Sequence, residues 1–179
     1  EHRFSGKINH KKSEFGASYR IGPRDFYGMS RDNEELFHLA DGTELHRKET
    51  GDPSHARMFM HNVNLNYSIQ DPEKYLFNAT FRYWNNHKPN WDYRGILSNL
   101  ENPDDYVDMV DLNSEDNQVP ALDLYYQRNL KNDQTLVFNV VGTYNRTSSH
   151  RFYQESRDQE LLTDINNQVS GNKYSVIGE

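Results

Sequence analysis

Alternation of apolar and polar residues is the dominant pattern along this chain, and it predicts β-strands. The clearest example is residues 135–145, where every second position from Leu136 to Tyr144 is apolar, aromatic or glycine. Successive side chains of a strand point to opposite faces, so this segment has one wholly apolar face. Residues 75–84 repeat the pattern, and aromatic residues lie at both ends of their apolar face.

Four further segments alternate in the same way. Residues 61–69 combine apolar positions with a ladder of Asn residues, which would be unusual in a buried helix. Shorter alternating runs occupy residues 4–8, 14–21 and 122–127, and another run begins at Tyr174. The sequence therefore predicts six strands and the start of a seventh. Their apolar faces carry no charge, and charged residues occur only on the opposite faces, at Lys7, Glu14, Arg20, Arg82 and Asp123.

The connections between these strands alternate between short and long. Three are short, polar and rich in turn-forming residues: residues 9–12, 70–74 and 131–134. Three others are much longer and rich in Asp, Asn, Glu and Arg: residues 22–56, 87–118 and 147–173. Irregular loops of this length are uncommon in compact soluble domains. We expect the long connections to be loops and the least ordered parts of the chain.

Short turns at one end and long loops at the other are typical of a transmembrane β-barrel with short periplasmic turns and long outer loops. The predicted fold is all-β, an antiparallel up-and-down meander of about seven strands within a larger barrel. The chain begins without Met and stops inside a predicted strand, so we expect residues 1–179 to be a segment of one barrel domain. A soluble sheet with one buried face is the alternative interpretation.

Composition narrows the possible functions. The chain is 34% hydrophobic with a mean hydropathy of −1.04, and it has no run near the roughly 18 apolar residues of a membrane helix. Mean hydropathy and the length of apolar runs do not detect barrel strands, because their apolar and polar residues alternate. The 27 acidic against 20 basic residues leave no basic stripe for nucleic acid, and the absence of Cys excludes disulfides and thiolate metal sites.

Several motifs resemble the outer-membrane β-barrel family related to TonB-dependent receptors, which is abundant in Bacteroidota. The similarity is carried by LDLYYQRNL at residues 122–130 and QTLVFNVVGTYNRT at 134–147, then by YLFNATFRY at 75–83 and RDFYG at 24–28. It extends over nearly the whole chain. These motifs describe a barrel wall and not a ligand site.

The resemblance implies a place in the cell outer membrane and a parent barrel of about 22 strands with a plug and an amino-terminal domain. It implies outer-membrane lipid, the remaining strands and the plug as partners, and binding or uptake of an extracellular nutrient as the function. We expect no cofactor. A secreted, soluble β-sheet ligand-binding module is the alternative from another functional class.

The best candidate ligand site is an aromatic and basic cluster at the point where a strand is expected to leave the membrane for a long loop. It comprises Arg82, Trp84, Trp91, Tyr93 and Arg94. Aromatic rings and guanidinium groups stack on and hydrogen-bond to sugars or peptides. An ordinary aromatic girdle with loop packing is the alternative interpretation.

Other chemistry is weakly supported. His38 and His46 match no metal-ligand spacing. An acidic cluster offers oxygen ligands for calcium but lacks the calcium-loop signature, so we interpret it as a solvated surface: Asp104, Asp105, Asp108, Asp111, Glu115 and Asp116. No nucleophile elbow, phosphate loop or catalytic triad occurs, and we do not expect an enzyme.

Overall fold

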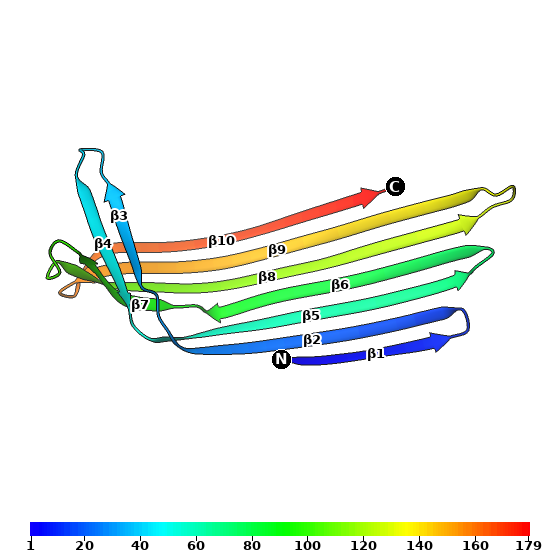
Figure 1. The fold of residues 1–179 in the computed structure, drawn as a ribbon, viewed down its shortest axis with the longest axis horizontal. Helices are drawn as coiled ribbons and strands as arrows, with labels where there is room; N and C mark the ends of the chain where they lie inside the picture. The colour runs from blue at the N-terminus through cyan, green and yellow to red at the C-terminus, as the bar shows by residue number, and fades with distance from the viewer.

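The structure, a computed structural model, describes residues 1–179 as a single antiparallel β-sheet of ten strands (Figure 1). Helices are absent, so none is long and apolar enough to cross a membrane. The strands are β1 (His2–His10), β2 (Ser13–Met29), β3 (Asn33–His38), β4 (Glu44–Gly51), β5 (Ser54–Asp71), β6 (Tyr75–Asn90), β7 (Tyr93–Asn99), β8 (Tyr106–Asn129), β9 (Thr135–Arg157) and β10 (Glu160–Gly178).

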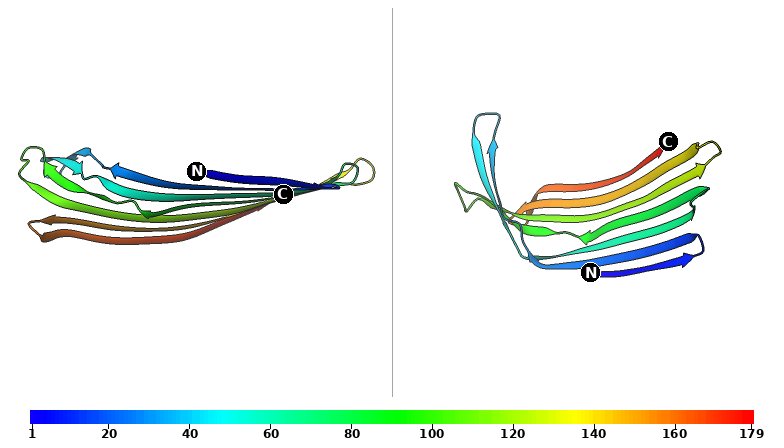
Figure 2. Two further views of the ribbon diagram at one scale, coloured as in Figure 1. Left: turned by 90° about the horizontal axis from the view of Figure 1, so that it is seen from below. Right: turned by 45° about the vertical axis from the view of Figure 1, so that its right-hand side comes forward.

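Most strands form a simple up-and-down meander. The order β1-β2-β5-β6-β8-β9-β10 crosses the sheet, and both outer strands run toward the end that holds the short turns (Figure 1). One half of the long strand β8 pairs with β6, and its other half pairs with β7 on the same side. From β7 the sheet branches to β4 and β3, and the β3–β4 hairpin projects from this end (Figure 2).

The six predicted strands are confirmed within β1, β2, β5, β6, β8 and β9, and Tyr174 lies in β10. Their register aligns the apolar positions, because directly paired residues of antiparallel strands share a face. Phe81 of β6, for example, pairs with Leu65 of β5 and Leu122 of β8. The apolar positions therefore form one surface, the apolar face, which includes Phe4, Phe15, Ala17, Tyr19, Val63, Leu65, Tyr67, Phe77, Ala79, Phe81, Tyr83, Leu122, Leu124, Tyr126, Phe138, Val140 and Tyr144.

The opposite side of the sheet, here called the polar face, carries the alternating polar residues. It includes Asn62, Asn64, Asn66, Asn78, Arg82, Asp123 and Asn139. Residues with odd numbers along β8 stay on this face up to Asp111, since the pairing of β8 with β9 contains no bulge. The polar face thus continues from the meander into the branched end.

The three short connections are confirmed as turns at one end of the sheet (Figure 1). Positive φ angles occur at Lys11 in the first turn and at Asn132 and Asp133 in the third. Asn and Asp tolerate the left-handed backbone that tight turns require.

The prediction of three long loops is wrong. Residues 22–56 extend β2, start β5 and form the β3–β4 hairpin, whereas residues 87–118 contain β7 and much of β8. Residues 147–173 continue the β9–β10 hairpin, which turns at Asp158 and Gln159. Polar residues occupy both faces here, so the ladder of backbone hydrogen bonds continues without the apolar alternation that signals a strand.

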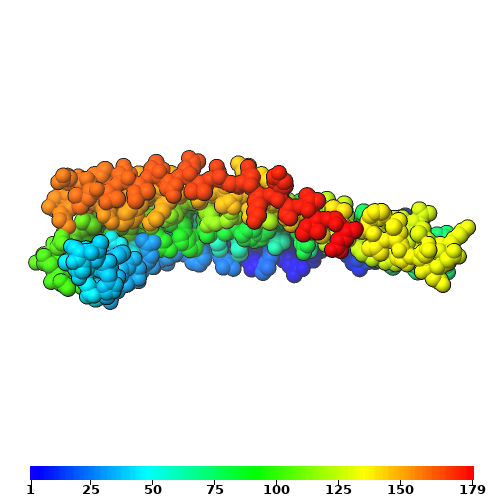
Figure 3. All heavy atoms as spheres, turned by 90° about the horizontal axis from the view of Figure 1, so that it is seen from above, coloured from blue at the N-terminus to red at the C-terminus, as the bar shows by residue number.

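A single layer of backbone leaves little of the chain buried, and only eight of 179 residues are. The largest fully buried side chains, Met109 and Asp111, lie at the branch. Glycine allows the strands to meet there, since a Cβ on Gly95 would lie 2.2 Å from the carbonyl oxygen of Thr50. The space-filling view shows the elongated body with β10 along one long edge (Figure 3). The outer edges of β1 and β10 have no neighbouring strand.

Candidate functional site

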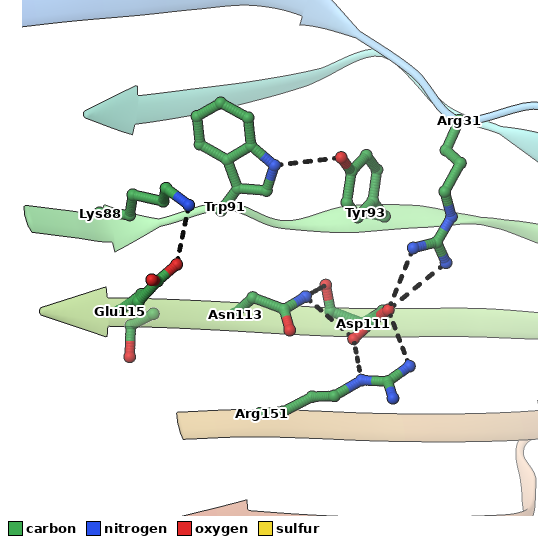
Figure 4. Close-up of a pocket in the computed structure, with 9 residues that line it drawn as sticks. Arg31, Lys88, Trp91, Tyr93, Asp111, Asn113, Glu115 and Arg151 are labelled. Carbon is green, nitrogen blue, oxygen red and sulfur yellow. Dashed lines mark hydrogen bonds and ion pairs between the residues drawn. The ribbon is translucent and has the colours of Figure 1, made fainter. Parts of the chain in front are cut away.

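A cavity of about 380 Å³ lies where β7 meets β8 on the polar face (Figure 4). Antiparallel neighbours and the β2–β3 connection bring together residues far apart in the sequence. The lining residues are Arg31, Lys88, Trp91, Tyr93, Asp111, Asn113, Ser114, Glu115 and Arg151. Asp111, Asn113 and Glu115 alternate along β8, so their side chains share one face.

Asp111 is the centre of the charged network, and its side chain is 2% exposed. Arg151 of β9 donates to both carboxylate oxygens, with Nε 2.8 Å from Oδ1 and Nη2 3.1 Å from Oδ2. Arg31 approaches Oδ2 from the other side at 3.3 and 3.4 Å, and its Nε donates to Glu49 at 2.8 Å. Asn113 donates to Oδ1 at 3.0 Å. The network joins β4, β8, β9 and the β2–β3 connection.

Opposing effects act on the protonation of Asp111. Burial raises the pKa of this carboxyl, but hydrogen bonds from Arg151 and Asn113 and the charges of both arginines outweigh burial and hold its pKa below the ordinary value. Asp111 therefore stays ionised at neutral pH. On the same face, burial and the hydrogen bond to Glu155 raise the pKa of the Tyr153 hydroxyl, which donates to that carboxylate at 2.6 Å.

An aromatic wall closes the other side of the cavity. The indole Nε1 of Trp91 donates to the hydroxyl of Tyr93 at 3.1 Å, which fixes the two rings relative to each other (Figure 4). The guanidinium of Arg31 lies 4.3 Å from the centre of the Tyr93 ring, and the ammonium of Lys88 lies 5.5 Å from that of Trp91. Phe26 packs edge-on against Trp91, with ring centres 5.4 Å apart.

The predicted aromatic and basic cluster is divided by the structure. Trp91 and Tyr93 line the cavity. Arg82 and Trp84 lie on the polar face too, but earlier in β6 and nearer the short turns. They pair there with Ala121 and Val119 of β8. Arg94 lies on the side of β7 opposite Tyr93, because it follows Tyr93 directly in the strand.

Sequence reasoning missed the arginines and the lysine of the cavity. Arg31 is 80 residues from Asp111, and Arg151 is 40 residues away, both in segments expected to be loops. Asp111 and Glu115 were identified only as acidic residues. The missing signal was the pairing of β8 with β9, which places Asn113 opposite Arg151.

The acidic cluster is spread over both faces of the sheet. Asp111 pairs with arginines, whereas Asp116 lies on the other side of β8 and accepts hydrogen bonds from Asn85 and Gln118. Asp105 pairs with Arg157 at the end of the sheet away from the short turns. No group of three or more His, Cys, Asp or Glu residues is arranged to hold a metal ion.

The network can hold a polar ligand between charged donors and an aromatic wall. No nucleophile with an adjacent general base occurs among the lining residues. No protein family model, curated protein or solved structure matches this chain.

Proposed function

We propose that this chain is a segment of an outer-membrane β-barrel, of the kind related to TonB-dependent receptors, that binds or takes up a nutrient at the cell surface. The observation that carries the proposal is the apolar face. It continues across the aligned strands without a charged residue between the rows of Phe77 and Tyr83. No second layer covers it, and Val140 and Phe138 are 41% and 53% exposed.

The dimensions of the apolar face suit a bilayer. Along β6, the alternation extends over the nine residues from Tyr75 to Tyr83, and charged neighbours, Asp71 and Arg128, first occur at the border row of Tyr75. A transmembrane β-strand, tilted by about 45°, needs roughly 9–11 residues to cross the bilayer. The alternating segment is therefore about as long as one crossing requires.

Aromatic residues border this band, as they do in membrane barrels. One border is a row of tyrosines that includes Tyr19, Tyr83, Tyr144 and Tyr174. Two residues further along the strands, the same face becomes polar at His61, Asn85, Gln118, Arg146 and Asn172, and only Ile21 of β2 remains apolar in this row. Such a sharp change is expected where strands pass from lipid into water.

Nutrient binding is supported by the position of the cavity. It lies on the polar face, which would line the interior of a closed barrel, and beyond the tyrosine row at the end away from the short turns. With short turns in the periplasm, this end would face the cell exterior. A ligand from outside would reach the cavity first.

Arginine substitutions at two neighbouring positions of β9 test the membrane assignment. Val140 lies near the middle of the apolar face, and Asn139 lies on the polar face. Val140→Arg should lower the stability of the protein in the bilayer by about 2–4 kcal/mol. Asn139→Arg should lower this stability much less. Each variant is produced in the cells that naturally make this protein. The measurement is the amount of folded variant that is recovered with the outer membranes.

Two results would contradict the proposal. Equal recovery of the two variants would mean that the apolar face does not contact lipid. Recovery of the unmodified protein in the soluble fraction or the medium would favour a secreted β-sheet ligand-binding module whose apolar face is covered by another copy or domain.

A further inference from the structure

We infer that the cavity beside Asp111 binds a small ligand that carries a carboxylate close to a ring, either a sugar ring or an aryl ring. This inference rests on the ligand-binding part of the proposed function and is independent of membrane insertion. It follows from which hydrogen-bonding groups of the cavity are already satisfied and which are free.

The acceptors of the cavity are used internally. Both oxygens of Asp111 accept from Arg31, Arg151 or Asn113. Glu115 accepts from Lys88 through Oε2, at 2.7 Å, and from Asn117 through Oε1. Each carboxylate therefore already has hydrogen-bond donors within the protein. A cationic ligand would have to displace one of these partners.

The donors are in surplus. An ammonium has three N–H groups and a guanidinium five, but Lys88 uses one on Glu115, and Arg151 uses only Nε and Nη2 on Asp111. The Nη1 group of Arg151 is free, and its side chain is 52% exposed. Spare charged donors of two basic residues are best satisfied by an oxyanion, because such hydrogen bonds are stronger than neutral ones.

The aromatic wall specifies the rest of the ligand. Trp91 and Tyr93 are held in place by their hydrogen bond, and the rings offer apolar surface beside the charged donors. Flat aromatic rings and the C–H faces of sugars both pack on such a wall. A volume of about 380 Å³ is near the lower end for ligand pockets, which suits one or two rings.

Two matched pairs of probes test this inference by calorimetry and by tryptophan fluorescence. Glucuronate is compared with glucose, and phenylacetate with 2-phenylethanol, so that each pair differs by a carboxylate against a hydroxymethyl group. At least one carboxylate should bind about tenfold more tightly than its alcohol. The preferred pair identifies whether the ring is a sugar or an aryl group. Equal affinities within both pairs, or no binding of either carboxylate, would overturn the inference.

A matched lysine pair locates the effect. Lys88→Gln should remove most of the preference for the carboxylate, whereas Lys12→Gln should preserve it. Both substitutions remove one charge and one ion pair, but Lys12 pairs with Asp71 at the opposite end of the sheet. An equal effect of both would indicate non-specific attraction and contradict the inference. Trp91→Leu should weaken the binding of the carboxylate and of its alcohol by the same factor.

The outcome is separable from that of the membrane test. A protein that fractionates with outer membranes but does not distinguish the probes overturns only the assigned ligand class. A protein that prefers the carboxylate but is recovered in the soluble fraction supports the ligand class and overturns the barrel assignment.

Discussion

Replacing Asp111 by Asn is the most direct test of what holds the branched end of the sheet together. Asn has nearly the same shape as Asp but no charge, so it retains one acceptor oxygen and directs an amide N–H₂ at the guanidinium groups. Arg151 would lose a bidentate partner, and Arg31 would keep only Glu49. The matched control is Asp123→Asn, on the same strand and the same face but outside every ion pair.

The size of the effect follows from the geometry of the network. Hydrogen bonds to charged groups contribute roughly 1.5–3 kcal/mol each when buried. The two bonds from Arg151 are short, but its side chain is half exposed, and those from Arg31 are long. Solvent screening and length therefore reduce the expected loss to about 2–3 kcal/mol. Asp123→Asn should change stability by less than about 0.5 kcal/mol.

Backbone amide hydrogen exchange measures this loss where it occurs. A loss of 2–3 kcal/mol corresponds to exchange about 30- to 150-fold faster in β7 and in the paired segments of β8 and β9. Exchange in β1, β2 and β5 should not change. If Asp111→Asn and Asp123→Asn gave the same exchange rates in β7, the network around Asp111 would not stabilise the branch, and our reasoning would be wrong.

Two further predictions concern the same end of the sheet. Gly95→Ala should lower the free energy of unfolding by about 1–3 kcal/mol, because its Cβ would meet the carbonyl of Thr50, whereas Gly142→Ala, with open space around it, should be nearly neutral in thermal unfolding. The lowered pKa of Asp111 makes its stabilisation fully present above about pH 5 and progressively lost as pH falls through the folded-state pKa. Exchange rates of unmodified protein and Asp111→Asn, compared at each pH, should therefore begin to converge only below about pH 4 and continue to converge as pH falls through the folded-state pKa, and a constant ratio down to pH 2 would contradict this.

The meander could be predicted from the sequence because one of its faces is apolar. In β6, alternation from Tyr75 to Tyr83 marks both the strand and its orientation. A shift in register by one residue would move an apolar side chain to the polar face. The aligned pairing of Phe81 with Leu65 and Leu122 is what such a constraint predicts.

The branched end could not be predicted in this way. Along β8, residues 113–118 are polar on both faces, so hydrophobic periodicity is lost although the backbone pairing continues. The cavity depends on contacts between segments 40 and 80 residues apart, which no local pattern encodes. Trp91 and Tyr93 were found because aromatic residues are conspicuous even without a known register.

The common direction of β1 and β10 restricts what can complete this sheet. In the seven-strand meander, neighbouring strands alternate in direction, so the first strand, β1, and the last, β10, run the same way. Two copies in the same orientation would therefore meet through parallel strands at both seams. Antiparallel closure requires an odd number of additional strands, whether they come from one polypeptide or from several. The finished cylinder would then contain an even number of strands, which is a rule of parity and holds for any diameter.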